Sequence, residues 1–231
     1  MSQTFHYSFF RIPKDRELAA FVEKYKNLRL QALKISPGSF SSTLEIESAL
    51  PDTEWVARLR SEKIETFVCS ATPLVSNEQQ STTTPNEPST WVGQLTLRGP
   101  LSSEEFALPA ESGQKPSGKG EFEEERWQML SLFTNPEHRG QGLGLTLCKE
   151  ALDYLKSYRD RPSAVRVRLM VKPDNHATVG LYRKLGFEET GKCTLAEALV
   201  ANGDAALLPE DISGAKYSAR TGLIMTADIS R

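Results

Sequence analysis

The stretch NPEHRGQGLG, residues 135–144, places three glycines at alternate positions directly after an arginine. A strand-like run, WQMLSLFTN (127–135), precedes it, and apolar residues at helical spacing follow it from Leu143 to Leu155. The first turn of a helix exposes backbone N–H groups without partners, and the helix dipole adds about half a positive charge there. Strand, glycine-rich turn and helix in this order predict an anion site, most naturally for a pyrophosphate.

The three glycines allow positive φ and a close approach of the backbone to a ligand, and Arg139 can add a charge-assisted contact. Two other phosphate-binding patterns fail at defined positions. A dinucleotide fingerprint needs a glycine where Leu145 stands, and a P-loop needs a lysine that this loop lacks. A plain connecting turn is the alternative that the loop alone leaves open.

A second motif, NHATVGLYRKLGF (175–187), follows in the chain. Together with RGQGLG (139–144) it resembles the acetyl-CoA signature of the GNAT acetyltransferase superfamily, R/Q-x-x-G-x-G/A before one helix and N-x-x-A-x-x-L-Y-x-x-x-G-F around the next. Thr178 stands where the family usually has alanine, a small-for-small change. The resemblance covers residues 5–74, 91–100 and 127–193 and the last strand.

The resemblance implies the GNAT fold, an α+β arrangement of mixed α/β type. In this fold a central, twisted, mixed sheet of six to seven strands has helices on both faces and is splayed between its two central parallel strands. Periodicity predicts strands at 5–10, 66–71, 91–97, 127–135, 165–171 and 222–229, and helices over 18–35, from Ser42, around Trp55, over 143–155 and over 173–187. We expect one domain over 1–231, with polar insertions at 76–90, 102–125 and 194–216.

By the same resemblance, acetyl-CoA is the co-substrate. Its pantetheine arm would follow the main chain of 132–134, and its pyrophosphate would meet the N–H groups of 139–144. Tyr182 would be catalytic and donate a proton to the departing thiolate, although an ordinary core aromatic is the structural alternative. The cofactor-binding residues implied are Leu132, Phe133, Thr134, Arg139, Gly140, Gln141, Gly142, Leu143, Gly144, Thr146, Asn175 and Tyr182.

Several of these assignments have a second interpretation. Asn175 is also a good N-cap for the helix that follows it, a role worth about 1 kcal/mol. Thr146 would offer its hydroxyl to phosphate. His138 and His176 receive no catalytic role, because a solvated loop histidine is the common case, and His6, on the first strand, gives no functional signal.

The sequence does not assign the general base. Gln128 stands where some GNAT enzymes carry a glutamate, and a glutamine cannot take up a proton. The candidates are Glu125, Glu45, Glu47 or a water molecule relayed to solvent. Glu45 also fits a capping box with Ser42.

Composition excludes several classes of protein. The chain has 231 residues and a formal net charge of −2, which argues against a nucleic-acid binder with a basic face. No apolar run approaches the ~18 residues of a membrane span, and no secretory signal is visible, so we expect no membrane partner and a cytoplasmic protein, with the nucleus left open. The cysteines at 69, 148 and 193 lack metal-ligand spacing; we expect no metal and reduced, structural thiols.

The leading hypothesis is an N-acetyltransferase that moves an acetyl group from acetyl-CoA to a primary amine of a small molecule or peptide in a ternary complex; a homodimer is left open. The rival is a non-catalytic acyl-CoA-binding module, which the missing base favours. An NAD-type domain would need an acid about twenty residues after the glycines, and Asp160 falls there only at a helix end.

Overall fold

The computed structural model describes residues 4–15, 18–74 and 89–231. In these residues seven strands form one sheet in the order β1-β2-β3-β4-β5-β7-β6. All neighbours are antiparallel except β4 and β5, which are parallel. The strands are β1 (Phe5–Arg11), β2 (Ile64–Pro73), β3 (Thr90–Leu101), β4 (Glu124–Thr134), β5 (Ala164–Val171), β6 (Glu188–Cys193) and β7 (Gly222–Ser230).

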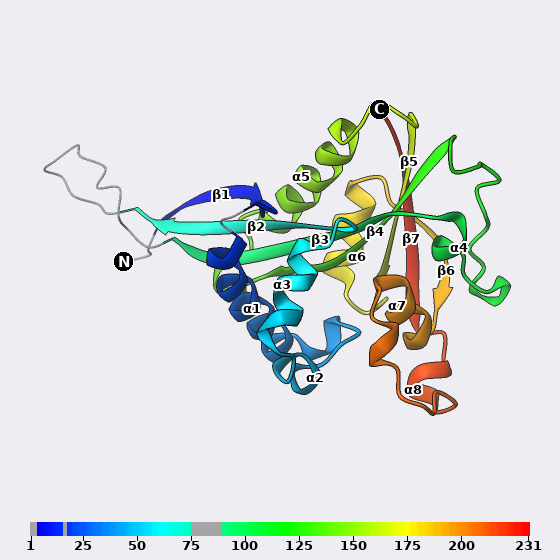
Figure 1. Cartoon of the computed structure of the whole chain (residues 1–231), viewed down its shortest axis with the longest axis horizontal. Coiled ribbons are helices and arrows are strands. Elements are labelled where there is room, and N and C mark those ends of the chain that lie inside the picture. The colour runs from blue at the N-terminus through cyan, green and yellow to red at the C-terminus, as the bar shows by residue number, and fades with distance from the viewer. Residues whose placement is uncertain (1–3, 16–17, 75–88) are drawn as a thin grey trace, which may run out of the picture.

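Helices cover both faces of the sheet (Figure 1). One apolar core joins α1 and α3 to the sheet around Trp55 and Trp91, and another joins α5 and α6 to the opposite face around Leu147 and Tyr182. The helices are α1 (Leu18–Ile35), α2 (Leu44–Ser48), α3 (Asp52–Arg60), α4 (Ser103–Phe106), α5 (Leu143–Ser157), α6 (His176–Lys184), α7 (Leu195–Asn202) and α8 (Ala215–Ser218). The expected mixed sheet with helices on both faces is therefore confirmed.

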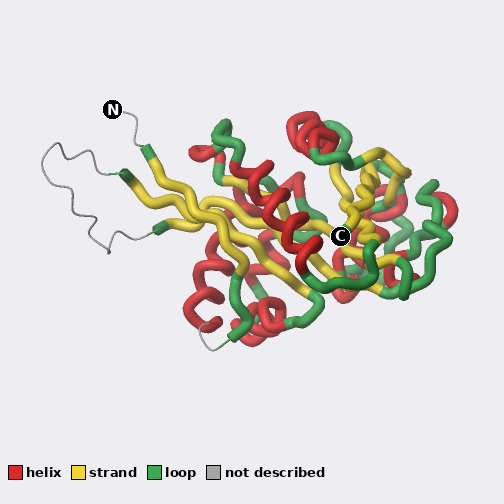
Figure 2. The backbone as a smooth tube through the Cα atoms, turned by 90° about the horizontal axis from the view of Figure 1, so that it is seen from above, coloured by secondary structure: helices red, strands yellow, loops and turns green. Residues whose placement is uncertain are grey.

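The two halves of the sheet separate between β4 and β5. These strands pair only from Glu124 with Ala164 to Gln128 with Arg168, although both continue beyond that point. In Figure 1, β1 to β4 run across the view whereas β5 and β7 run from top to bottom, and Figure 2 shows the same divergence from above. The far end of β4 thus has an open edge on its β5 side.

One strand of the seven was not expected from the sequence. The segment EETGKC, which forms β6, is mostly polar and lies at the edge of the sheet, beside β7. An edge strand needs no apolar alternation when much of it faces solvent, so periodicity gives no signal for it.

A helix start was assigned one residue too early. The N-cap of α2 is Thr43, whose hydroxyl accepts a hydrogen bond from the amide of Ile46, so the expected capping box of Ser42 and Glu45 is wrong. Ser42 is instead buried, and its side chain faces the Glu47 carboxylate. Both hydroxyl residues suit an N-cap, and only packing decides between them.

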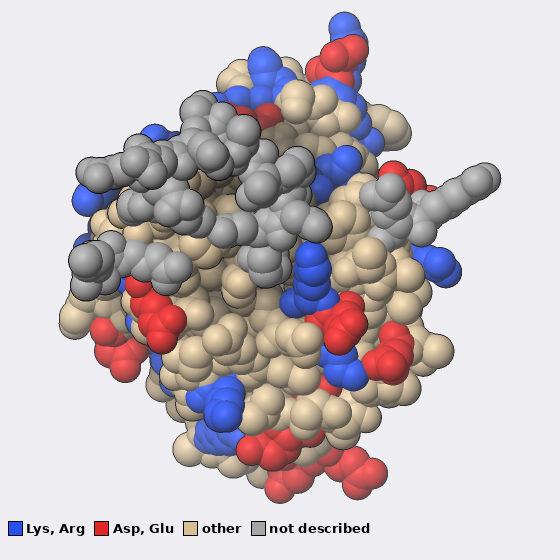
Figure 3. Space-filling model, turned by 90° about the vertical axis from the view of Figure 1, so that its left-hand side faces the viewer, with Lys and Arg blue, Asp and Glu red and all other residues tan. Residues whose placement is uncertain are grey.

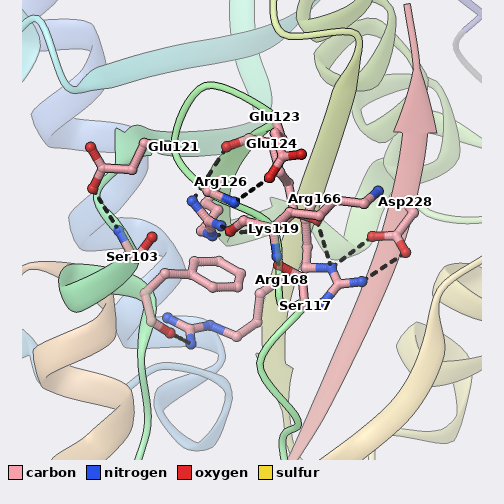
Figure 4. A network of polar contacts seen from close by, with 12 residues as sticks. Ser103, Ser117, Lys119, Glu121, Glu123, Glu124, Arg126, Arg166, Arg168 and Asp228 are labelled. Atoms are coloured by element: carbon pink, nitrogen blue, oxygen red, sulfur yellow. Dashed lines mark hydrogen bonds and ion pairs between the residues drawn. The ribbon is translucent and has the colours of Figure 1, made fainter.

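The segment 102–125, expected as a polar insertion, is tied both to itself and to the sheet. The amide of Ser103 donates to Glu121 at 3.2 Å within the segment (Figure 4). The Ser117 hydroxyl donates to Glu124 of β4 at 2.7 Å, and Arg168 of β5 donates to the Phe106 carbonyl at 2.6 Å, so two points of the segment are attached to strands. The insertion expected at 76–90 lies almost wholly outside the described residues.

Other expectations concern membranes and thiols. No helix in the described ranges is long and apolar enough to cross a membrane. The face seen in Figure 3 carries both signs of charge interspersed, without a large patch of one sign.

All three cysteines are buried and free, and burial raises the pKa of Cys69 and of Cys148 to about 12. Protonated, buried thiols agree with the structural role expected for them.

Candidate functional site

A cavity of about 660 Å³, here called the loop cavity, opens where β4 leaves β5. The glycine loop, the start of α5, the open edge of β4 and one side of α6 form its walls. Of the twelve residues implied to bind cofactor, those that line it are Leu132, Phe133, Thr134, Arg139, Gly140, Gly142, Leu143, Gly144, Asn175 and Tyr182. The fold thus brings both sequence motifs to one space, and the role of each residue there stays a prediction.

The loop has the backbone conformation that the glycines were expected to supply. Gly140 and Gly142 have φ values of 80° and 76°, a region that other residues rarely adopt. A Cβ built on either would meet no protein atom within 4 Å, so space beside the loop is open. The amide of Thr146 makes the first helical bond, to the Gly142 carbonyl at 3.0 Å, which leaves the preceding first-turn amides without intrahelical partners. This is the geometry of an anion cradle.

Gly144 has a different reason to be glycine. It is helical, and a Cβ there would lie 3.3 Å from Leu181 Cδ1, tighter than ordinary packing. Its small size lets α5 approach α6 closely.

Two of the expected cofactor residues do not line the loop cavity. Gln141 is exposed and is not among the lining residues, and the Thr146 hydroxyl donates back to the Gly142 carbonyl at 3.3 Å. In this structure the hydroxyl is used within its own helix, and its expected contact with phosphate stays a prediction. Arg139 lines the cavity with its Nε donating to the Thr134 carbonyl at 3.1 Å.

Tyr182 fits both interpretations that the sequence left open. It is 6% exposed and belongs to the core cluster, with its ring centroid 5.7 Å from that of Phe187. It also lines the loop cavity. Burial, assisted by Cys148, raises the pKa of Tyr182 well above its usual value, so the phenol keeps its proton near neutral pH. Such a group can donate a proton and cannot serve as a base.

Asn175 is the N-cap of α6, as expected. Its side-chain oxygen accepts a hydrogen bond from the amide of Thr178 at 3.3 Å, and the residue also lines the loop cavity. The Thr178 that replaces the family's alanine lines the same wall without disturbing the cap.

A β-bulge shapes the open edge of β4. Leu130 and Phe133 pair with Thr96 and Gln94 of β3, so β4 has one residue more than its partner between these pairs. Within the bulge, Ser131 has a φ of 59°. This is uncommon for a residue other than glycine and points to a constraint from outside the strand.

That constraint comes from a buried ion pair. Arg29 of α1 donates from Nη1 to the Ser131 hydroxyl at 3.2 Å and holds the Glu47 carboxylate at both oxygens, at 2.6 and 3.0 Å. Arg58 adds a bond to Glu47 at 3.2 Å. Arg29 and Glu47 are 5% and 1% exposed, so this bidentate pair joins α1 and α2 to the bulge deep within the protein.

None of the glutamates considered as the general base lines the loop cavity, and two of them are held in ion pairs. Glu125 is 3% exposed and is held by the indole of Trp127 and by Arg159 and Arg231. It does not line the loop cavity. The sequence suggested Glu125 because it lies just before Gln128, the position where some GNAT enzymes carry a glutamate. In the structure, arginines distant in the sequence hold its carboxylate in ion pairs.

The other two candidates are also poorly placed to act as the base. Glu45 is exposed and lies outside the loop cavity. Burial acts to raise the pKa of Glu47, but the hydrogen bonds and charge of Arg29 hold that pKa below its usual value. A carboxylate so strongly paired is a poor proton acceptor.

Gln128 begins a chain of hydrogen bonds instead of supplying a base. The buried Arg168, which has no ion pair in the described part of the chain, donates from Nε to Gln128 Oε1 at 2.7 Å. Gln128 Nε2 donates to Asn202 Oδ1 at 3.2 Å, and Asn202 Nδ2 donates to the Ser41 hydroxyl at 3.2 Å. Because Arg168 can only donate, it fixes the orientation of both amides. A glutamate at 128 could not donate to Asn202.

This chain ends at a second, smaller cavity of about 230 Å³, here called the α7 cavity. It shares with the loop cavity the β4 stretch 129–131 and the β5 end at 170–172, so the two lie side by side at the splay. Its other wall comes from α7 and the segment that follows, within the 194–216 region that the sequence motifs did not cover. Asp204 lines it, and no motif pointed to this residue.

His138 corrects a further expectation. The histidine is 8% exposed, its Nδ1 lies 3.1 Å from the Tyr7 hydroxyl, and its ring packs edge-on to Phe5 at 4.7 Å. It therefore joins β1 to the loop after β4 and is not a solvated loop residue. The apolar strand that covers it is remote in sequence, so local composition gave no sign of its burial.

Comparisons with known proteins agree with this geometry. Residues 75–187 match the model of the Acetyltransferase (GNAT) family. A Bacillus subtilis protein, proposed in its name to acetylate the alanine of ribosomal protein bS18, is 38% identical over 64 residues, 28% of this chain and 40% of that protein. An uncharacterized N-acetyltransferase of Methanocaldococcus jannaschii is 34% identical over 62 residues, 27% of this chain and 26% of that protein. This chain thus matches less than half the length of either relative.

Solved structures share the fold over nearly the whole chain. An acetyltransferase of the GNAT family from Streptococcus pneumoniae superposes with a TM-score of 0.53 at 14% identity, covering 97% of this chain and 100% of that one. Arabidopsis thaliana NAA60 in complex with acetyl-CoA gives a TM-score of 0.54 at 14% identity, covering 97% and 99%. At this identity the likeness concerns the fold.

Proposed function

This chain belongs to the GNAT acetyltransferase family, and from that premise we propose that it transfers an acetyl group from acetyl-CoA to a primary amine in a ternary complex. The observation that carries the proposal is the loop cavity, where the glycine loop, the open edge of β4 and Tyr182 line one space. N-acetylation of a ribosomal protein, in the name of one relative, supports an amine acceptor.

The residues of the loop cavity fit coenzyme A. Open space beside Gly140 and Gly142, and first-turn amides of α5 without intrahelical partners, suit a pyrophosphate. The unpaired edge of β4 beyond Gln128 offers backbone donors and acceptors to the amides of a pantetheine arm, as a strand would. Peptide groups would supply most of these contacts, so substitutions that preserve the backbone conformation and the open space beside the loop should change binding little.

The chemistry requires one new bond and three proton movements. When bound, acetyl-CoA supplies a thioester whose carbonyl carbon bonds to the amine nitrogen as the C–S bond breaks. An acceptor that enters as an ammonium first releases one proton to solvent, the attacking nitrogen loses a second, and the thiolate gains one. Tyr182, which keeps its proton in the buried wall of the loop cavity, is the group we assign to the thiolate. Ser131, with its φ of 59°, lines the loop cavity on β4, and we assign the stabilisation of the carbonyl oxygen to a backbone N–H of this stretch.

One experiment in two steps tests the proposal. Calorimetric titration of the full chain with acetyl-CoA measures binding, and a free-thiol assay on the same sample measures acetyl transfer to a panel of amines. Binding with amine-dependent thiol release supports an acetyltransferase. Absence of binding would contradict the assignment of the glycine loop as a pyrophosphate cradle.

The rival function is a non-catalytic acyl-CoA-binding module of the same fold. Its support is that Glu125 and Glu47 are both held in ion pairs and that position 128 is a glutamine. In the same experiment, this module would bind acetyl-CoA without thiol release for any amine.

A further inference from the structure

The α7 cavity contains an uneven set of charges. Three cationic side chains line it, those of Arg29, Lys172 and Lys216, whereas Asp204 is the one acid among its described lining residues. Building on the proposed acetyl transfer, we propose that this cavity binds the acceptor, with its amine against Asp204 and an anionic group of the same molecule against the two lysines. The acceptor class is then an amine that also carries an acid, and not a polyamine.

Asp204 is built into the cavity wall. Gly203 ends α7 with a φ of 87°, and the amide of Asp204 bonds back to the Leu199 carbonyl at 2.8 Å, which places the residue just past the helix. Its side chain is 23% exposed. The carboxylate is therefore mostly withdrawn from water, yet it lines the cavity.

The charge of Asp204 is only weakly compensated. Its nearest cation is Arg58, at 4.0 Å, and Arg58 lies closer to the carboxylate of Glu47, at 3.2 Å. Burial raises the pKa of Asp204. The charges of Arg58, Arg29 and Arg98 oppose this and that of Glu47 adds to it, and the net rise agrees with a carboxylate that lacks a full partner. An ammonium group entering the cavity would supply that partner.

The lysines account for the second half of the proposal. Arg29 is neutralised by its two hydrogen bonds to Glu47, whereas neither Lys172 nor Lys216 forms an ion pair in the described part of the chain. Both lysines are exposed, at the β5 end and on α8. One ammonium of a polyamine could reach Asp204, but its remaining ammonium groups would face these lysines, so like charges would disfavour it.

The end of the hydrogen-bond chain adds a polar contact for the acid. Asn202 Nδ2 occupies a lone pair of the Ser41 oxygen, so the Ser41 hydroxyl proton is left to donate. Ser41 lines the α7 cavity, where a carboxylate or carbonyl oxygen can accept that proton.

The test measures thiol release by the full chain at saturating acetyl-CoA with matched acceptors. These are spermidine, free glutamate, free glutamine, and the tripeptide amides Ala-Asp-Glu and Ala-Lys-Lys. We expect kcat/KM for the acidic acceptors to exceed that for spermidine and Ala-Lys-Lys by about tenfold or more. Glutamate against Ala-Asp-Glu shows whether the acid belongs to a free amino acid or to a peptide N-terminus.

Variants separate the two contacts. Asp204→Asn should raise KM about tenfold for every acceptor, and Lys216→Gln should raise it for acidic acceptors alone, with the Kd of acetyl-CoA unchanged in both. Lys216 is used because Lys172 also lines the loop cavity. The matched controls are Asp211→Asn, exposed in the same segment, and Lys149→Gln, exposed on α5, and both should match the unmodified chain.

A preference for spermidine, or an unchanged KM in Asp204→Asn, would overturn this inference while leaving acetyl transfer in place. If acetyl-CoA binds and no acceptor releases thiol, the proposed function itself fails, and the inference fails with it.

Discussion

Replacing Glu47 by glutamine tests whether this residue is structural or catalytic. Glutamine has nearly the same shape and keeps one oxygen for Arg29, but it removes the charge that Arg29 and Arg58 share. Arg29 is 5% exposed and would remain charged with only a neutral partner. Breaking one side of a buried ion pair costs about 3–5 kcal/mol, and the oxygen that remains reduces our expectation to about 2–3 kcal/mol.

The assay is urea unfolding followed by circular dichroism, together with the thermal midpoint. For a chain of this size each kcal/mol shifts Tm by roughly 2–4 °C, so Glu47→Gln should melt about 5–10 °C lower. Glu45→Gln is the matched control. Glu45 is an exposed neighbour in the same short helix, and its substitution should stay within about 0.5 kcal/mol.

The pH dependence of stability has a defined sign. Because Arg29 holds the pKa of Glu47 below its unfolded value, the stabilisation is complete above the unfolded pKa of about 4.3 and is lost as pH falls through the lower, folded pKa. The unmodified chain should therefore lose stability more steeply than Glu47→Gln in that acid range. A variant with normal stability but no acetyl transfer would refute this reasoning and make Glu47 the base.

The remaining predictions concern the loop cavity. Gly142→Val forces a β-branched residue into a φ of 76° and fills the space beside the loop, so the Kd of acetyl-CoA measured by calorimetry should rise at least tenfold. The control is Gly180→Ala, in a helix where a Cβ meets open space. Unchanged binding in Gly142→Val would mean that the loop only connects β4 to α5. Tyr182→Phe should lower kcat by about 10² while the Kd of acetyl-CoA stays nearly constant, and an unchanged kcat would remove Tyr182 from the mechanism. Gln128→Glu cannot donate to Asn202, so acceptor KM should rise a few-fold with little change in kcat; a rise in kcat would instead show that position 128 can serve as the base.

Local features of the fold and of the cofactor wall could be predicted from the sequence alone. The φ values of Gly140 and Gly142, the N-cap at Asn175 and the amphipathic face of α5 each depend on a few consecutive residues. Backbone conformation and helical periodicity are properties of such short stretches, which is why they could be predicted. The mixed sheet was implied by the resemblance of the two motifs to the GNAT family.

Only the tertiary structure determined the burial, the partners and hence the roles of the charged and polar groups. Glu125 and Glu47 were equal candidates for the base, and both turned out to be held by arginines from distant parts of the chain. Asp204, in a segment without a motif, became the acid of the α7 cavity, and His138 became buried under β1. The state of an ionisable group depends on burial and on partners within a few ångströms, and only the folded chain sets these neighbours.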